Sequence, residues 1–118
     1  MRGRMSQAVS EYLLSDVNKR FRDVLRSSRI GFIEGYLFGS KAARQSVSDS
    51  DWDYLIVLEK EVSGAELRQL TGRLLIEFHK IVPDEPADII IQSKDAFGMN
   101  KNRLNHISNE AFTKGIKI

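Results

Sequence analysis

The chain of 118 residues contains no cysteine, only two prolines, two histidines and one tryptophan. Without cysteine it can form neither a disulfide nor a thiolate metal site, and cysteine usage leaves the redox compartment open. No apolar run approaches membrane-spanning length, and the N-terminus lacks a charged stretch followed by an uninterrupted apolar core. We therefore expect a soluble, cytoplasmic protein that does not enter a membrane.

The excess of positive over negative charge is also small, because the net charge is only +2. Such a balance does not by itself indicate nucleic acid, although nucleic acid stays open as a partner. With 42% hydrophobic residues, the length predicts one globular domain over residues 1–118. A second substrate-binding domain does not fit in this length, so we expect an acceptor site that is shallow or shared with a partner.

Hydrophobic periodicity predicts the order helix, strand, short helix, strand, helix, strand, helix. The expected helices include 5–28 and 64–82, the expected strands include 32–38 and 53–58, and residues 115–118 form a candidate final strand. This alternation favours an α/β (α+β) fold. A basic face on the first helix is interpreted as solvated surface rather than as a docking site for RNA or an acidic protein. Trp52 is interpreted as packing, with base stacking as the alternative.

Two short motifs carry the chemistry of this sequence. Gly39 and Ser40 end an apolar strand, and Asp51 and Asp53 enter the next one after the small, polar stretch 45–50. A glycine lets backbone amides approach a phosphate, a serine hydroxyl adds a donor, and Lys41 adds a positive charge. If extended chain already begins at Asp51, the two carboxylates point the same way and repel each other. Mg²⁺, which takes carboxylate and phosphate oxygens, would relieve that repulsion.

The run GSKAARQSVSDSDWDYLIVLE resembles the signature of the DNA polymerase β-like nucleotidyltransferase superfamily, in its minimal nucleotidyltransferase branch. That signature is Gly-Ser, ten residues and then Asp-x-Asp, which this chain matches at Gly39, Ser40, Asp51 and Asp53. The resemblance implies the nucleotidyltransferase fold, a small mixed sheet of three to four strands flanked by helices. Relatives often carry Arg-Ala-Arg-Gly after the Gly-Ser, where this chain has residues 41–44, Lys-Ala-Ala-Arg. Lysine is the poorer bidentate phosphate ligand, so nucleotide affinity or orientation is expected to differ.

The resemblance also predicts a third carboxylate that opens a later apolar strand, and Asp88 fits that description. If the strands at Asp53 and Asp88 run parallel, and the first strand runs antiparallel to them, Gly39, Asp53 and Asp88 share one edge of the sheet. In the implied site, Asp51 and Asp53 hold two Mg²⁺ ions, and Asp88 ligates the second ion and accepts a proton. Ser40, Lys41 and the amides after Gly39 are expected to hold the β and γ phosphates.

The implied activity is transfer of a nucleoside monophosphate, AMP from ATP, to an acceptor hydroxyl. Small members of this family often act as antitoxins that add AMP to a tyrosine of a helical, HEPN-type toxin. We take this as the expected role, with non-catalytic occlusion of such a partner, or binding of nucleotide alone, as the alternative. An antibiotic-modifying nucleotidyltransferase is disfavoured, since those enzymes usually add a C-terminal helical domain.

Overall fold

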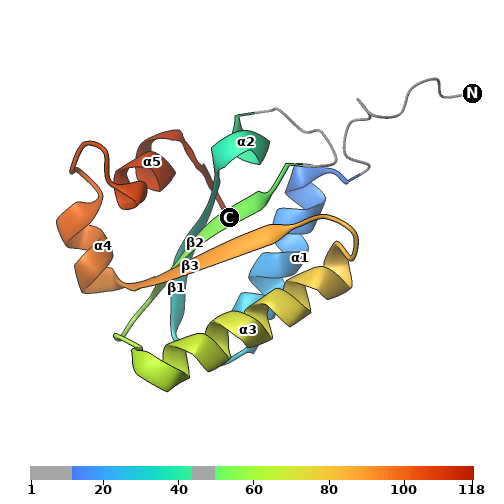
Figure 1. Ribbon diagram of the computed structural model, residues 1–118, viewed down its shortest axis with the longest axis horizontal. Coiled ribbons are helices and arrows are strands. Elements are labelled where there is room, and N and C mark those ends of the chain that lie inside the picture. The colour runs from blue at the N-terminus through green and yellow to red at the C-terminus, as the bar shows by residue number, and fades with distance from the viewer. Residues whose placement is uncertain (1–11, 44–49) are drawn as a thin grey trace, which may run out of the picture.

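Helices and strands alternate along the chain in nearly the predicted order (Figure 1). The computed structural model describes residues 12–43 and 50–118, so most of the expected loop 45–50 and the first part of the expected helix 5–28 lie outside it. The elements are α1 (Leu14–Ser27), β1 (Phe32–Phe38), α2 (Gly39–Ala42), β2 (Trp52–Leu58), α3 (Gly64–Ile81), β3 (Ala87–Ser93), α4 (Lys94–Asn100), α5 (Ile107–Lys114) and β4 (Ile116–Lys117).

Helix boundaries differ from the prediction in two places. α1 begins at Leu14, because Leu13 has extended backbone angles of φ −82° and ψ 128°, and its side chain is 73% exposed rather than part of the apolar face. After β3, two helices stand where the sequence predicts one. The chain turns between α4 and α5 at Asn105, whose φ of 65° is not compatible with a continuous right-handed helix.

The sheet has the strand order β3-β2-β1-β4 in the described residues. β1 pairs antiparallel with β2, and β2 pairs parallel with β3. This arrangement confirms the predicted mixed sheet of three to four strands flanked by helices. It also confirms that the end of β1 and the starts of β2 and β3 lie at one edge of the sheet.

β2 is buried on both faces, which explains its nearly continuous apolar sequence. Tyr54 and Ile56 face the layer formed by α1 and α3, whereas Leu55 and Val57 pack with Phe97 of α4 on the other face. Figure 1 shows these two helical layers on opposite sides of the strands. In the described part of the chain, no helix is both long enough and apolar enough to cross a membrane.

A buried hydrogen bond joins β2 to α1. The Tyr54 hydroxyl donates to Asn18 Oδ1 at 2.6 Å, and neither side chain has much contact with solvent. Tyr54→Phe leaves the Asn18 acceptor buried without this donor, so we expect a loss of about 1–2 kcal/mol in urea unfolding. The matched variant Tyr12→Phe removes an exposed bond to Asp84 and should change stability by less than about 0.5 kcal/mol. Equal effects of the two variants would contradict this account.

Candidate active site

The turn after β1 places a glycine directly against an aspartate of β2. Gly39 has φ +76°, in the left-handed region that side chains rarely adopt. A Cβ added to Gly39 would lie 2.5 Å from Asp53 Oδ2, so the position has no room for a side chain. Both the backbone conformation and this close approach therefore require glycine. The small turn and the carboxylate, although separated in sequence by the polar stretch between them, form one local structure.

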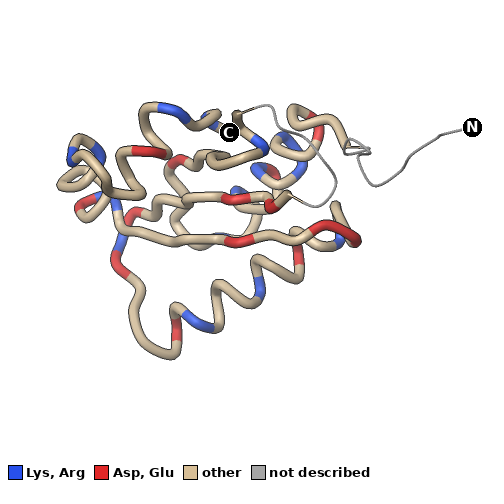
Figure 2. The backbone as a smooth tube through the Cα atoms, turned by 45° about the horizontal axis from the view of Figure 1, so that its top comes forward, with Lys and Arg blue, Asp and Glu red and all other residues tan. Residues whose placement is uncertain are grey.

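The register of the sheet brings the second aspartate beside the first. Asp53 is the partner of Phe38 on β1 and of Asp88 on β3, so the two carboxylates occupy neighbouring positions on parallel strands. Partners in register point to the same face, which here is the face covered by α4 and α5. Figure 2 shows acidic positions in red on these adjacent strands. Asp51 is exposed and precedes β2, which begins at Trp52, so strand alternation does not set its direction.

Negative charge accumulates around Asp53. Burial raises the pKa of this carboxyl above its ordinary value, and the charges of Asp51, Asp88 and Glu110 raise the pKa further. The structure therefore brings Asp51 and Asp88 into electrostatic reach of Asp53. Glu110, on α5, is a fourth acidic group that the sequence analysis did not include. No spacing or motif points to it, because its approach to Asp53 depends on how α5 packs on the sheet.

Ser40 and Lys41, although adjacent, lie in different environments. Ser40 is exposed at the start of α2, where a hydroxyl and the first amides of a helix can meet a ligand. Lys41 is fully buried, and its Nζ lies 3.0 Å from Glu85 Oε1 and 4.9 Å from the centre of the Trp52 ring. The Lys41 ammonium is therefore not placed to make the predicted phosphate contact. Trp52 is itself fully buried, which agrees with packing rather than base stacking.

The oxygen donors at this edge suit a hard divalent cation in their chemistry. A carboxylate such as Asp53, whose pKa is raised by burial and by neighbouring carboxylates, gains from a cation, because the cation offsets the repulsion. Over residues 12–43 and 50–118, however, no three His, Asp or Glu side chains are gathered closely enough to hold a metal ion. The donor set fits Mg²⁺ in type, and the Mg²⁺ site stays a prediction.

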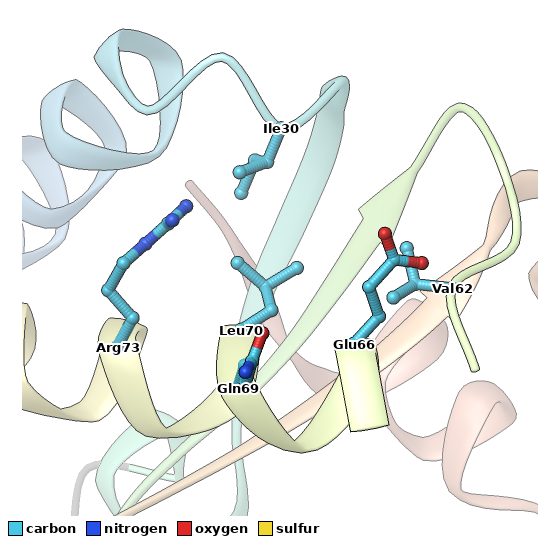
Figure 3. A pocket seen from close by; sticks show the side chains of 6 residues that line it. All are labelled: Ile30, Val62, Glu66, Gln69, Leu70 and Arg73. Atoms are coloured by element: carbon cyan, nitrogen blue, oxygen red, sulfur yellow. The ribbon is translucent and has the colours of Figure 1, made fainter. Parts of the chain in front are cut away.

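Two cavities in the described residues have none of the three aspartates in their lining. The first, of about 470 Å³, opens where α3 faces the chain before β1 and after β2, at the opposite end of β1 from Gly39 (Figure 3). In the described residues it is lined by Ile30, Val62, Glu66, Gln69, Leu70 and Arg73. The second, of about 580 Å³, lies along the turn before α5 and includes Glu110. Neither cavity therefore contains the candidate site as a whole, although the second shares Glu110 with it.

Comparison of the chain with protein-family models, with curated proteins and with solved structures gave no match. The case for a function therefore depends on the residues and geometry described above.

Proposed function

We propose that this protein is a metal-dependent nucleotidyltransferase that transfers AMP from ATP to an acceptor hydroxyl. The observation that carries the proposal is the contact between the Gly39 turn and the Asp53 carboxylate, with Asp88 in register on the next parallel strand. In this arrangement, groups that could donate hydrogen bonds to a phosphate lie beside acidic groups at one edge of the sheet. Charge placement of this kind is the main protein contribution to phosphoryl transfer.

In this proposal the Ser40 hydroxyl and the amides after Gly39 bind the β and γ phosphates, and Asp51, Asp53 and Asp88 would hold Mg²⁺. When bound, Mg²⁺ supplies charge neutralisation for the triphosphate and lowers the pKa of the acceptor hydroxyl. Asp88, exposed at the start of β3, accepts the hydroxyl proton. The acceptor oxygen forms a bond to the α-phosphorus, the bond from that phosphorus to the bridging oxygen breaks, and pyrophosphate leaves.

The acceptor in this proposal is a tyrosine of a helical protein of the HEPN type, which the chain would inactivate as an antitoxin. Asp88 and Asp51 are exposed, so an acceptor carried on another protein could reach them. A second candidate, occlusion of the partner without chemistry, is favoured by one observation. The Lys41 ammonium is held in the interior by Glu85, which removes a predicted phosphate contact.

The two candidates can be distinguished by incubating this protein with Mg²⁺, ATP labelled in its α-phosphate, and the protein encoded by the neighbouring gene. Label that becomes covalently attached to a tyrosine of that protein supports transfer. A tight complex without label supports occlusion. Absence of both complex and label counts against both candidates. Omission of Mg²⁺ should abolish labelling without abolishing a complex, which separates binding from chemistry.

A further inference from the structure

Lys41, Glu85 and Trp52 form a buried polar cluster on the face of the sheet opposite the aspartates. Glu85 Oε1 accepts from Lys41 Nζ at 3.0 Å and from Trp52 Nε1 at 2.8 Å. The relative exposures of the three residues are 0% for Lys41, 4% for Glu85 and 0% for Trp52. A buried charge pair of this kind holds its geometry closely, because each charge is costly without the other. We call this set the Lys41 cluster.

Each member of the Lys41 cluster is close in sequence to a candidate site residue. Lys41 follows Ser40 directly, Trp52 precedes Asp53 directly, and Glu85 lies shortly before Asp88. The backbone of the same region is tied down as well. The Trp52 amide donates to the Pro86 carbonyl at 2.9 Å, and His79 Nε2 lies 3.0 Å from the Glu85 carbonyl oxygen.

We propose that the Lys41 cluster is a positioning device, which fixes the distance between the Gly39 turn and the strands that carry Asp53 and Asp88. Glu85 and Lys41 are then positioning residues, and Lys41 acts through its ion pair rather than by touching phosphate. This role rests on the proposed function for its effect on transfer, although the positioning itself is a property of the fold. α2 is a helix of only four residues, and Lys41 is the residue that it buries, so the ion pair of Lys41 ties this short helix to the chain before β3.

The two roles of Lys41 predict different effects of removing the charge of Glu85. If Lys41 bound phosphate, Glu85→Gln would weaken the competition for its ammonium, and ATP would bind equally well or more tightly. If Lys41 positions the turn, Glu85→Gln removes the negative charge that lies 3.0 Å from this buried ammonium and shifts the turn. Glutamine retains an oxygen for the Trp52 indole, so the variant changes charge more than hydrogen bonding. The double variant Lys41→Met/Glu85→Gln removes both charges, and it should recover part of what each single variant loses.

The test is a double-mutant cycle on Lys41→Met and Glu85→Gln, with kcat for transfer and the ATP Kd measured separately. We expect each single variant to lower kcat about tenfold or more, with a smaller change in the ATP Kd, because misplacement of reacting groups affects turnover most. The double variant should regain at least part of kcat. The exposed pair Lys80 and Glu77, 3.0 Å apart, provides the matched control cycle, Lys80→Met and Glu77→Gln, with no effect.

Backbone amide NMR shifts give a readout that does not depend on the proposed function. Both single variants should shift the amides of Gly39, Ser40, Asp53 and Asp88, and the double variant should return them toward their original positions. The one tryptophan gives one indole N–H signal, which should move with the charge of Glu85. If one single variant fails to fold, the other single variant and the double variant supply the comparison of kcat, Kd and amide shifts.

Three outcomes would overturn the inference. A rise in the ATP Kd of Lys41→Met equal to its loss of kcat/KM, with kcat constant and with ATP bound by Glu85→Gln as well as or better than by the unaltered chain, would make Lys41 a phosphate ligand. Amide shifts confined to the cluster, with the four site amides unmoved, would make the cluster purely structural. Additive losses in the double variant would exclude a paired role. If the unaltered protein transfers no label, the proposed function fails, and the amide shifts alone still decide whether the cluster positions the site.

Discussion

Asp53→Asn should lower transfer at least about 100-fold and, at the same time, raise the thermal stability of the metal-free chain. The loss of transfer follows from the removal of a charge that the site needs for Mg²⁺. The gain in stability follows from the raised pKa of Asp53, whose carboxylate is partly buried beside Asp51, Asp88 and Glu110. Asparagine has nearly the same shape without the charge, so it removes the repulsion and keeps the packing.

The sign of this effect fixes its pH dependence. A carboxyl whose folded pKa is raised contributes stability in its protonated form, which is fully present below the unfolded pKa of about 4. That contribution is lost as the pH rises through the higher folded pKa. The asparagine side chain cannot ionise, so the stability advantage of the variant should be small in acid and should grow toward neutral pH. Thermal unfolding in the presence of a chelator at several pH values measures the difference.

Asp95→Asn is the control for Asp53→Asn, because Asp95 is exposed on α4 at the other end of β3. It should leave transfer unchanged and should not reproduce the pH-dependent gain in stability. Added Mg²⁺ should stabilise the unaltered chain more than the Asp53→Asn variant, since bound ligand stabilises only a chain that binds it. Normal turnover of Asp53→Asn would overturn the active-site assignment. A variant that is less stable at neutral pH would contradict the electrostatic account.

The backbone of the candidate site could be predicted from sequence because local signals and sheet geometry agree. β1 has the predicted boundaries 32–38, and β2 starts one residue before the predicted Asp53. Once β1 runs antiparallel and β3 parallel to β2, Gly39, Asp53 and Asp88 must meet at one edge. The strength of this inference comes from period-two alternation and short connections, which depend on few long-range details.

The same argument does not predict the directions of individual side chains. Lys41 follows a predicted phosphate-binding turn, yet its ammonium enters the interior because Glu85, remote in sequence, provides a buried partner. Glu110 was missed for a related reason, since α5 is remote from Asp53 along the chain and its packing on the sheet decides the approach. A charged residue has no periodic pattern that reveals such a partner. Contacts between elements that are remote in sequence can therefore be identified only from the structure.

Gly39→Ala should destabilise the fold by about 1–3 kcal/mol and reduce transfer to a level near that of Asp53→Asn. Two costs combine in this variant. Alanine is strained at φ +76°, and its Cβ would lie 2.5 Å from Asp53 Oδ2, so either the turn or the carboxylate must move. Urea unfolding measures the first effect, and labelled-ATP transfer measures the second.

Gly72→Ala is the matched control, because Gly72 lies within α3 and a Cβ there has no atom within 4 Å. That variant should stabilise the fold by about 0.5–1 kcal/mol, since alanine is the better helix former. The two costs at Gly39 separate in the background of Asp53→Ala, where the carboxylate is absent and only the backbone strain remains. Gly39→Ala should then cost clearly less than it does in the unaltered chain. An equal cost in both backgrounds would mean that the glycine serves the turn alone, and that its contact with Asp53 does not constrain the site.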